Sequence, residues 1–131
     1  MNDDPENQGD STPSSTIARA ANMLTSEVGP EGTIEIFELF VRDARSRADE
    51  TANAHQARNA MELRRAAHSF ASVCRTVGAD DFATILEAVE RSAVVADFNA
   101  ASGLITRAFQ ELGGVLRLVE SEVDRLRKEV A

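Results

Sequence analysis

The sequence predicts an all-α fold, an antiparallel up-down-up-down four-helix bundle with a short extra helix at its N-terminus. Apolar residues recur at three- and four-residue spacing through most of the chain, which is typical of helices packed by one face. The alternation that marks half-buried strands is absent, as are Tyr and Trp. Short segments separate the periodic stretches, so consecutive helices are expected to run antiparallel.

The chain of 131 residues has the size of a single domain. Residues 1–13 are rich in Asp, Asn, Ser, Gly and Pro and lack periodic apolar residues, so we interpret them as a flexible acidic leader. Residues 14–131 are expected to form one helical-bundle domain.

The N-terminal half is expected to contain two helices of unequal length. The short one covers Ser14–Val28, with Ser14 or Ser15 as its cap, and ends at Gly29-Pro30. The longer one starts near Gly32-Thr33, and its pattern is lost over Asn53–Asn59.

The C-terminal half is expected to contain three helices. The first runs from about Asn59 or Ala60 to Thr76 and is followed by Gly78, at a position that favours a left-handed backbone. Asp80 or Asp81 is expected to cap the next helix. The last helix runs from Asp97 toward Lys128, and Gly113-Gly114 allows a bend in it.

Charge and hydropathy exclude several classes of protein. The formal net charge is −8, from 22 acidic and 14 basic residues, which argues against binding to nucleic acid or to an anionic membrane. No segment approaches the ~18 uninterrupted apolar residues that a membrane span requires. We therefore expect a cytoplasmic protein.

His68 is the residue that we expect to carry chemistry. Its helix has an apolar stripe made of Leu63, Ala66, Ala67, Phe70, Val73, Cys74 and Val77. At ~100° per residue this stripe centres roughly 180° from His68, so the imidazole is expected to face water. Its neighbours within one or two turns are Met61, Arg64, Arg65, Ala71, Ser72 and Arg75.

These neighbours suit an exposed nucleophile that receives a phosphoryl group from another protein. Histidine titrates near pH ~6.5, so much of it carries a neutral nitrogen at pH 7. Arg64, Arg65 and Arg75 offer positive charge for the transferring oxygens. The small side chains of Ala71 and Ser72 leave room for a partner to approach.

The segment His68-Ser69-Phe70-Ala71-Ser72, followed by Val77-Gly78-Ala79, resembles the signature of histidine phosphotransfer (HPt) domains. That signature is His-x-Leu-Lys-Gly and, a few residues later, an aliphatic-Gly-Ala turn. The likeness extends from about Ile34 to Leu126. Ala71 replaces the usual lysine and Ser72 the usual glycine. Because alanine lacks the positive charge of lysine, phosphoryl transfer would be slower or would depend on Arg75.

The resemblance implies a phosphorelay carrier with His68 as phosphoacceptor. It would accept the phosphoryl group from a histidine kinase or a receiver aspartate and pass it to a response-regulator receiver. It would not be an enzyme and would have no nucleotide site, metal or cofactor of its own, since Mg²⁺ is expected on the receiver. Supporting residues would be Arg64, Arg65, Ala71, Ser72 and Arg75, with Met61 in partner docking. We expect a monomer.

Two other functions remain open. One is an adaptor that binds receivers without transferring phosphoryl groups. The other is a plain helical dimerisation module, which would expose an apolar stripe. The arginines can also be an ordinary solvated face that pairs with Glu62 and with acids on neighbouring helices.

The remaining candidate residues are interpreted as structural. Cys74 lies on the apolar stripe, and His55 has no context that suggests a role. Phe37, Phe40, Phe70, Phe82, Phe98 and Phe109 are core candidates by spacing. Glu87 and Glu90 do not form the repeated Glu-x-x-His pattern of a di-iron bundle.

Overall fold

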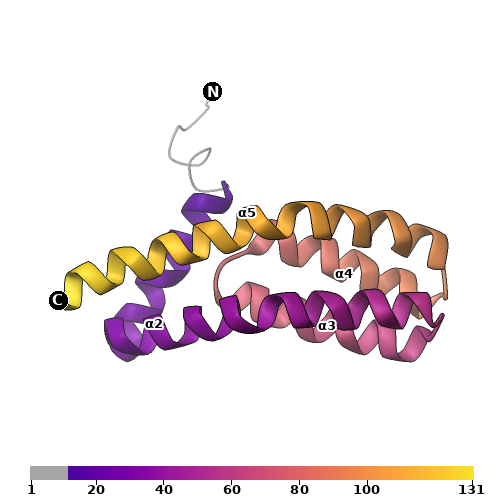
Figure 1. The fold of residues 1–131 in the computed structure, drawn as a ribbon, viewed down its shortest axis with the longest axis horizontal. Coiled ribbons are helices and arrows are strands. Elements are labelled where there is room, and N and C mark those ends of the chain that lie inside the picture. Colours follow the sequence, from indigo (N-terminus) through magenta and orange to yellow (C-terminus); the bar gives the residue numbers. More distant parts are fainter. Residues whose placement is uncertain (1–11) are drawn as a thin grey trace, which may run out of the picture.

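A computed structural model describes residues 12–131, and this part of the chain is almost entirely helical and has no strand (Figure 1). The predicted all-α class is therefore confirmed. The helices are α2 (Pro13–Gln56), α3 (Ala60–Thr76), α4 (Asp80–Val94) and α5 (Phe98–Val130). Each helix packs against the next, and α5 returns to pack along α2. Because the connections are short, consecutive helices in the bundle run antiparallel (Figure 1).

The expected short N-terminal helix and the longer one that follows are joined into a single kinked element, α2. Gly29 has φ 82° and ψ 167°, which breaks the helical path where Gly29-Pro30 predicts an end. Thr12, rather than Ser14 or Ser15, is the N-cap, and its side chain accepts a hydrogen bond from the Ser15 amide. The predicted leader therefore overlaps the start of α2, and the rest of it, residues 1–11, lies outside the described residues.

Two other helix boundaries differ from the prediction. Helix α2 continues to Gln56 through the stretch where the pattern is lost, because Thr51 and Ala54 still face the core. Ala79 is the N-cap of α4 and makes no side-chain capping bond, so the expected Asp80 or Asp81 cap is wrong. Helix α5 passes through Gly113-Gly114 without interruption, since packing against α2 and α4 holds it.

The core contains four of the six phenylalanines that spacing predicts. Phe37, Phe40, Phe70 and Phe82 are buried, and the rings of Phe70 and Phe82 meet edge to face at 5.6 Å. Phe98 is half-buried at the start of α5. The prediction for Phe109 is wrong, because its side chain is 43% exposed. Its neighbour Ala108 takes the inward position, and a rotation of ~100° carries Phe109 to the surface.

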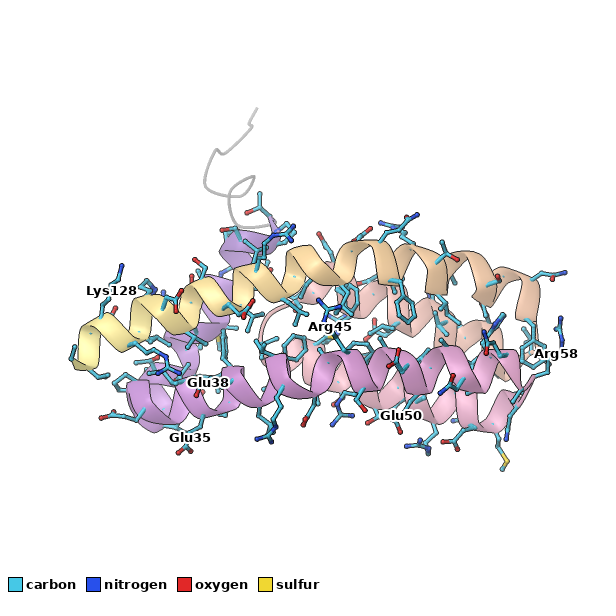
Figure 2. All side chains as sticks on the ribbon, in the orientation of Figure 1. Glu35, Glu38, Arg45, Glu50, Arg58 and Lys128 are labelled. Atoms are coloured by element: carbon cyan, nitrogen blue, oxygen red, sulfur yellow. The ribbon has the colours of Figure 1, made fainter. Side chains whose placement is uncertain are left out.

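Charged side chains make contacts at both ends of the bundle, where Figure 2 labels Glu38 and Arg58. Arg127, near the C-terminus of α5, forms an ion pair with Glu38 of α2. At the other end Arg58 lies between α2 and α3, with its guanidinium 5.3 Å from the centre of the Phe98 ring. No helix in residues 12–131 is long and apolar enough to cross a membrane.

Candidate functional site

His68 lies at the centre of α3 and projects into solvent, with 71% of its side chain exposed. Leu63, Ala67, Phe70 and Cys74 fill the opposite side of the helix and are buried. Helix α3 begins where the Asn59 side chain accepts a hydrogen bond from the Glu62 amide. The packed apolar stripe therefore fixes the direction in which the imidazole points.

Within residues 12–131 the imidazole pairs with one charged side chain, that of Glu90 on α4. The Nδ1 atom of His68 lies 3.1 Å from Oε2 and 3.2 Å from Oε1 of Glu90. An ionised carboxylate only accepts hydrogen bonds, so in the neutral ring Nδ1 carries the proton and donates it to this pair of oxygens. The Nε2 atom then keeps its lone pair, as a nucleophile requires.

Sequence reasoning did not find Glu90 as a partner of His68. A signal was present, because both residues lie 11 positions from Ala79, in the turn between α3 and α4. In an antiparallel helix pair, residues at equal distance from the turn lie side by side.

Two of the three predicted arginines are held by carboxylates. Arg65 forms an ion pair with Glu62, three residues earlier, and lies 3.6 Å from Glu50 of α2. The hydrogen bond between these two side chains lowers the pKa of Glu62 and raises the pKa of Arg65. Figure 2 labels Glu50 on α2. Much of the positive charge of Arg65 is thus already balanced.

Arg75 is held across the helix pair by α4. Its Nε and Nη2 atoms donate to the two carboxylate oxygens of Glu87 at 3.0 and 2.8 Å, and Nη1 lies 3.6 Å from Asp80. This bidentate contact raises the pKa of Arg75 and lowers that of Glu87. Arg64 is exposed and has no hydrogen bond or ion pair among residues 12–131. It is the predicted cation that remains available to a ligand.

The small residues that follow His68 differ in exposure. Ser72 is exposed, as expected for a docking surface, but Ala71 is only 4% exposed and belongs to the core. Ala71 still lines a hollow at the end of α3 together with His68 and Ser72. Met61, about two turns before His68, is 79% exposed.

Two open hollows flank His68, and both include Glu90. The hollow toward the start of α3 is lined by Asn59, Met61, Glu62, Arg64, Arg65, His68, Ser69 and Glu90. The hollow toward its end is lined by His68, Ala71, Ser72, Arg75, Glu87, Glu90 and Arg91. All the predicted site residues thus border one continuous surface, and His68 lies at its centre.

Other potentially reactive groups lie apart from this surface. Cys74 is buried, and burial raises the pKa of its thiol to about 12. His55 is half-buried, and its Nε2 atom lies 2.8 Å from the carbonyl oxygen of Phe98, to which it donates. No group of three or more His, Cys, Asp or Glu side chains in the described chain can hold a metal ion.

Comparison with known proteins identifies the family. The Hpt domain family matches residues 35–129, which include all of the surface described above. The crystal structure of histidine-containing phosphotransfer protein B (HptB) from Pseudomonas aeruginosa PAO1 is similar, with a TM-score of 0.76 and 28% sequence identity over 82% of this chain and 92% of that chain. No curated protein matches. The predicted resemblance is confirmed, and this chain belongs to the Hpt domain family.

Proposed function

We propose that this protein is a phosphorelay carrier in two-component signalling, with His68 as the residue that holds the phosphoryl group. The observation that carries the proposal is the pair His68–Glu90, in which a carboxylate faces Nδ1, while the side chain is 71% exposed and Nε2 has no hydrogen-bond partner among residues 12–131. Membership of the Hpt family and the similarity to HptB support the same role.

The proposed reaction transfers a phosphoryl group between two proteins. The lone pair of His68 Nε2 attacks the phosphorus of a receiver's aspartyl phosphate. The bond from phosphorus to the aspartate oxygen breaks, and its electron pair stays on that carboxylate. The reverse sequence passes the group to a second receiver. Catalysis here is mainly positioning and charge stabilisation, for which Arg64 is a nearby cation that has no ion pair among residues 12–131.

The proposed partners are a response-regulator receiver domain and a histidine kinase in the cytoplasm. The receiver would supply the Mg²⁺ ion, and the bundle would present the nucleophile without a nucleotide site of its own. Met61 and Ser72 lie exposed on either side of His68 and would contact the receiver. We expect the carrier to act as a monomer.

A transfer profile tests this function. The protein is mixed with each phosphorylated receiver of its source organism, and acid-labile, base-stable label on the bundle is measured. We expect label on the wild type and none on His68→Gln, whereas His55→Gln is labelled like the wild type. Absence of label with every receiver contradicts the proposal.

A receiver-binding adaptor is the second candidate, favoured by two observations around His68. Alanine stands where the family places a lysine, and Arg65 and Arg75 are already paired. Binding of a receiver with equal affinity to the wild type and to His68→Ala, without phosphoryl movement, identifies the adaptor.

A further inference from the structure

The carboxylate of Glu90 is placed where it can affect a phosphorylated His68 as well as the free ring. Both of its oxygens face Nδ1, at 3.1 and 3.2 Å. Its side chain is only 23% exposed, in contrast to the imidazole. Val89 and Ala93 on the same helix are buried, so the backbone that carries Glu90 is fixed against the core.

Glu90 is the acidic residue of α4 whose carboxylate accepts a hydrogen bond from the imidazole. Glu87 also lies near His68, but both of its oxygens are bound by Arg75. The other charged residues that line the two hollows with His68 are Glu62, Arg64 and Arg65 on α3 and Arg91 on α4. No hydrogen bond joins any of them to the imidazole within residues 12–131.

Resting on the proposed function, we propose that Glu90 is a positioning residue that makes phosphorylated His68 a strong phosphoryl donor with a short lifetime. When Nε2 bonds to phosphorus and Nδ1 keeps its proton, the ring carries a positive charge. The carboxylate of Glu90 stabilises that charge and holds the proton in place.

Retention of this proton determines how easily the phosphoryl group leaves. When the bond between phosphorus and Nε2 breaks, its electron pair returns to Nε2. If Nδ1 is protonated, the leaving group is neutral imidazole, whereas loss of that proton would require imidazolate to leave. The phosphoryl group passes to a receiver's carboxylate or to water, and Glu90 favours both outcomes because it keeps Nδ1 protonated.

The test uses the full chain phosphorylated with phosphoramidate, a small donor that requires no receiver. Glu90→Gln keeps the side-chain volume and an oxygen that accepts from Nδ1, and it removes only the charge. Glu111→Gln is the matched control, since it makes the same change in a carboxylate paired with Arg107 on α5. The half-life of phosphohistidine is measured at neutral pH for each protein, together with the rate of transfer to an unphosphorylated receiver.

We expect Glu90→Gln to lengthen the half-life and slow the transfer, each by roughly tenfold, and Glu111→Gln to match the wild type. The effect is smaller than the ~10⁴-fold loss that follows when a buried carboxylate–histidine pair is neutralised, because water screens this one. Equal half-lives for Glu90→Gln and Glu111→Gln overturn the proposal.

A second measurement keeps this test separate from that of the function itself. Nitrogen-15 chemical shifts of the unphosphorylated protein report which ring nitrogen carries the proton. We expect Nδ1 in the wild type and a shift toward Nε2, the preference of free histidine, in Glu90→Ala. If phosphoramidate leaves His68 unlabelled, the proposed function fails, and unchanged shifts in Glu90→Ala then also reject the role of Glu90.

Discussion

Thr16 of α2 is bonded to Gly78, in the turn that follows the His68 helix. The Thr16 hydroxyl donates to the Gly78 carbonyl oxygen at 2.7 Å, across 62 positions of sequence. Gly78 has φ +78° and lies so close that an added Cβ atom would collide with the Thr16 carbonyl oxygen and lie 2.7 Å from the Cβ of Ala20. The N-terminal part of α2 thus fixes the α3–α4 turn, which sets the register between His68 and Glu90.

Gly78→Ala is expected to destabilise the protein by about 2–4 kcal/mol. A side chain in the left-handed region and a collision with fixed backbone each contribute. Urea unfolding followed by circular dichroism measures the change. Gly103→Ala is the control, because Gly103 is helical and has no atom within 4 Å of its added Cβ, so it should gain roughly 0.5–1 kcal/mol. Equal stability of Gly78→Ala and the wild type contradicts this account of the turn.

The Cys74 thiol is expected to be inert in the folded protein. Burial raises its pKa to about 12, so very little reactive thiolate exists at pH 8. A thiol-specific reagent should label Cys74 slowly under native conditions and quickly in denaturant. Fast labelling of the native protein would mean that α3 does not pack as described.

Removal of the ion pair between Arg75 and Glu87 is expected to cost less than ~1 kcal/mol, since both side chains are partly exposed. The hydrogen bond with Arg75 lowers the pKa of Glu87 in the folded state. The pair therefore stabilises the fold above the unfolded pKa of glutamate, ~4.3, and this contribution is lost as pH falls through the lower folded value.

A double-mutant cycle with Arg75→Met and Glu87→Gln, based on urea unfolding, measures this coupling. We expect a favourable coupling at pH 7 that disappears in acid. A coupling that persists at pH 2 would show that the contact is not electrostatic.

Arg64 is expected to contribute more to receiver binding than Arg65. The charge of Arg65 is balanced by Glu62 and Glu50, whereas that of Arg64 is free within the described chain. Calorimetric titration with a receiver should give a weaker affinity for Arg64→Gln than for Arg65→Gln, and the difference should shrink at high salt. Both variants should have the same midpoint of urea unfolding as the wild type. A larger loss for Arg65→Gln would reverse this ranking.

Periodicity within single helices predicted the features that depend on one helix alone. The spacing of apolar residues from Leu63 to Val77 placed His68 in solvent, and Gly78 marked the left-handed residue of the turn. The kink at Gly29 also follows from local sequence, since glycine tolerates its positive φ and proline cannot donate a backbone hydrogen bond.

Features that depend on a neighbouring helix do not follow from the periodicity of one helix alone. Ala71 lies within ~60° of His68 around α3, but its side chain belongs to the core. The partners of Arg75 and His68, Glu87 and Glu90, come from α4, so they require the pairing of the two helices to be known first. Phe109 was misplaced because Ala108 beside it fits the same pattern and is the residue that packs inward.

Nuclear magnetic resonance can locate the phosphoryl group on a single atom of the protein. After exposure to a phosphorylated receiver, phosphorus–nitrogen couplings in the isotopically labelled protein identify the nitrogen that is bonded to phosphorus. We expect a single bond, to Nε2 of His68, with the proton on Nδ1 facing Glu90. Phosphorus on Nδ1 of His68, on His55 or on any other side chain would contradict this expectation.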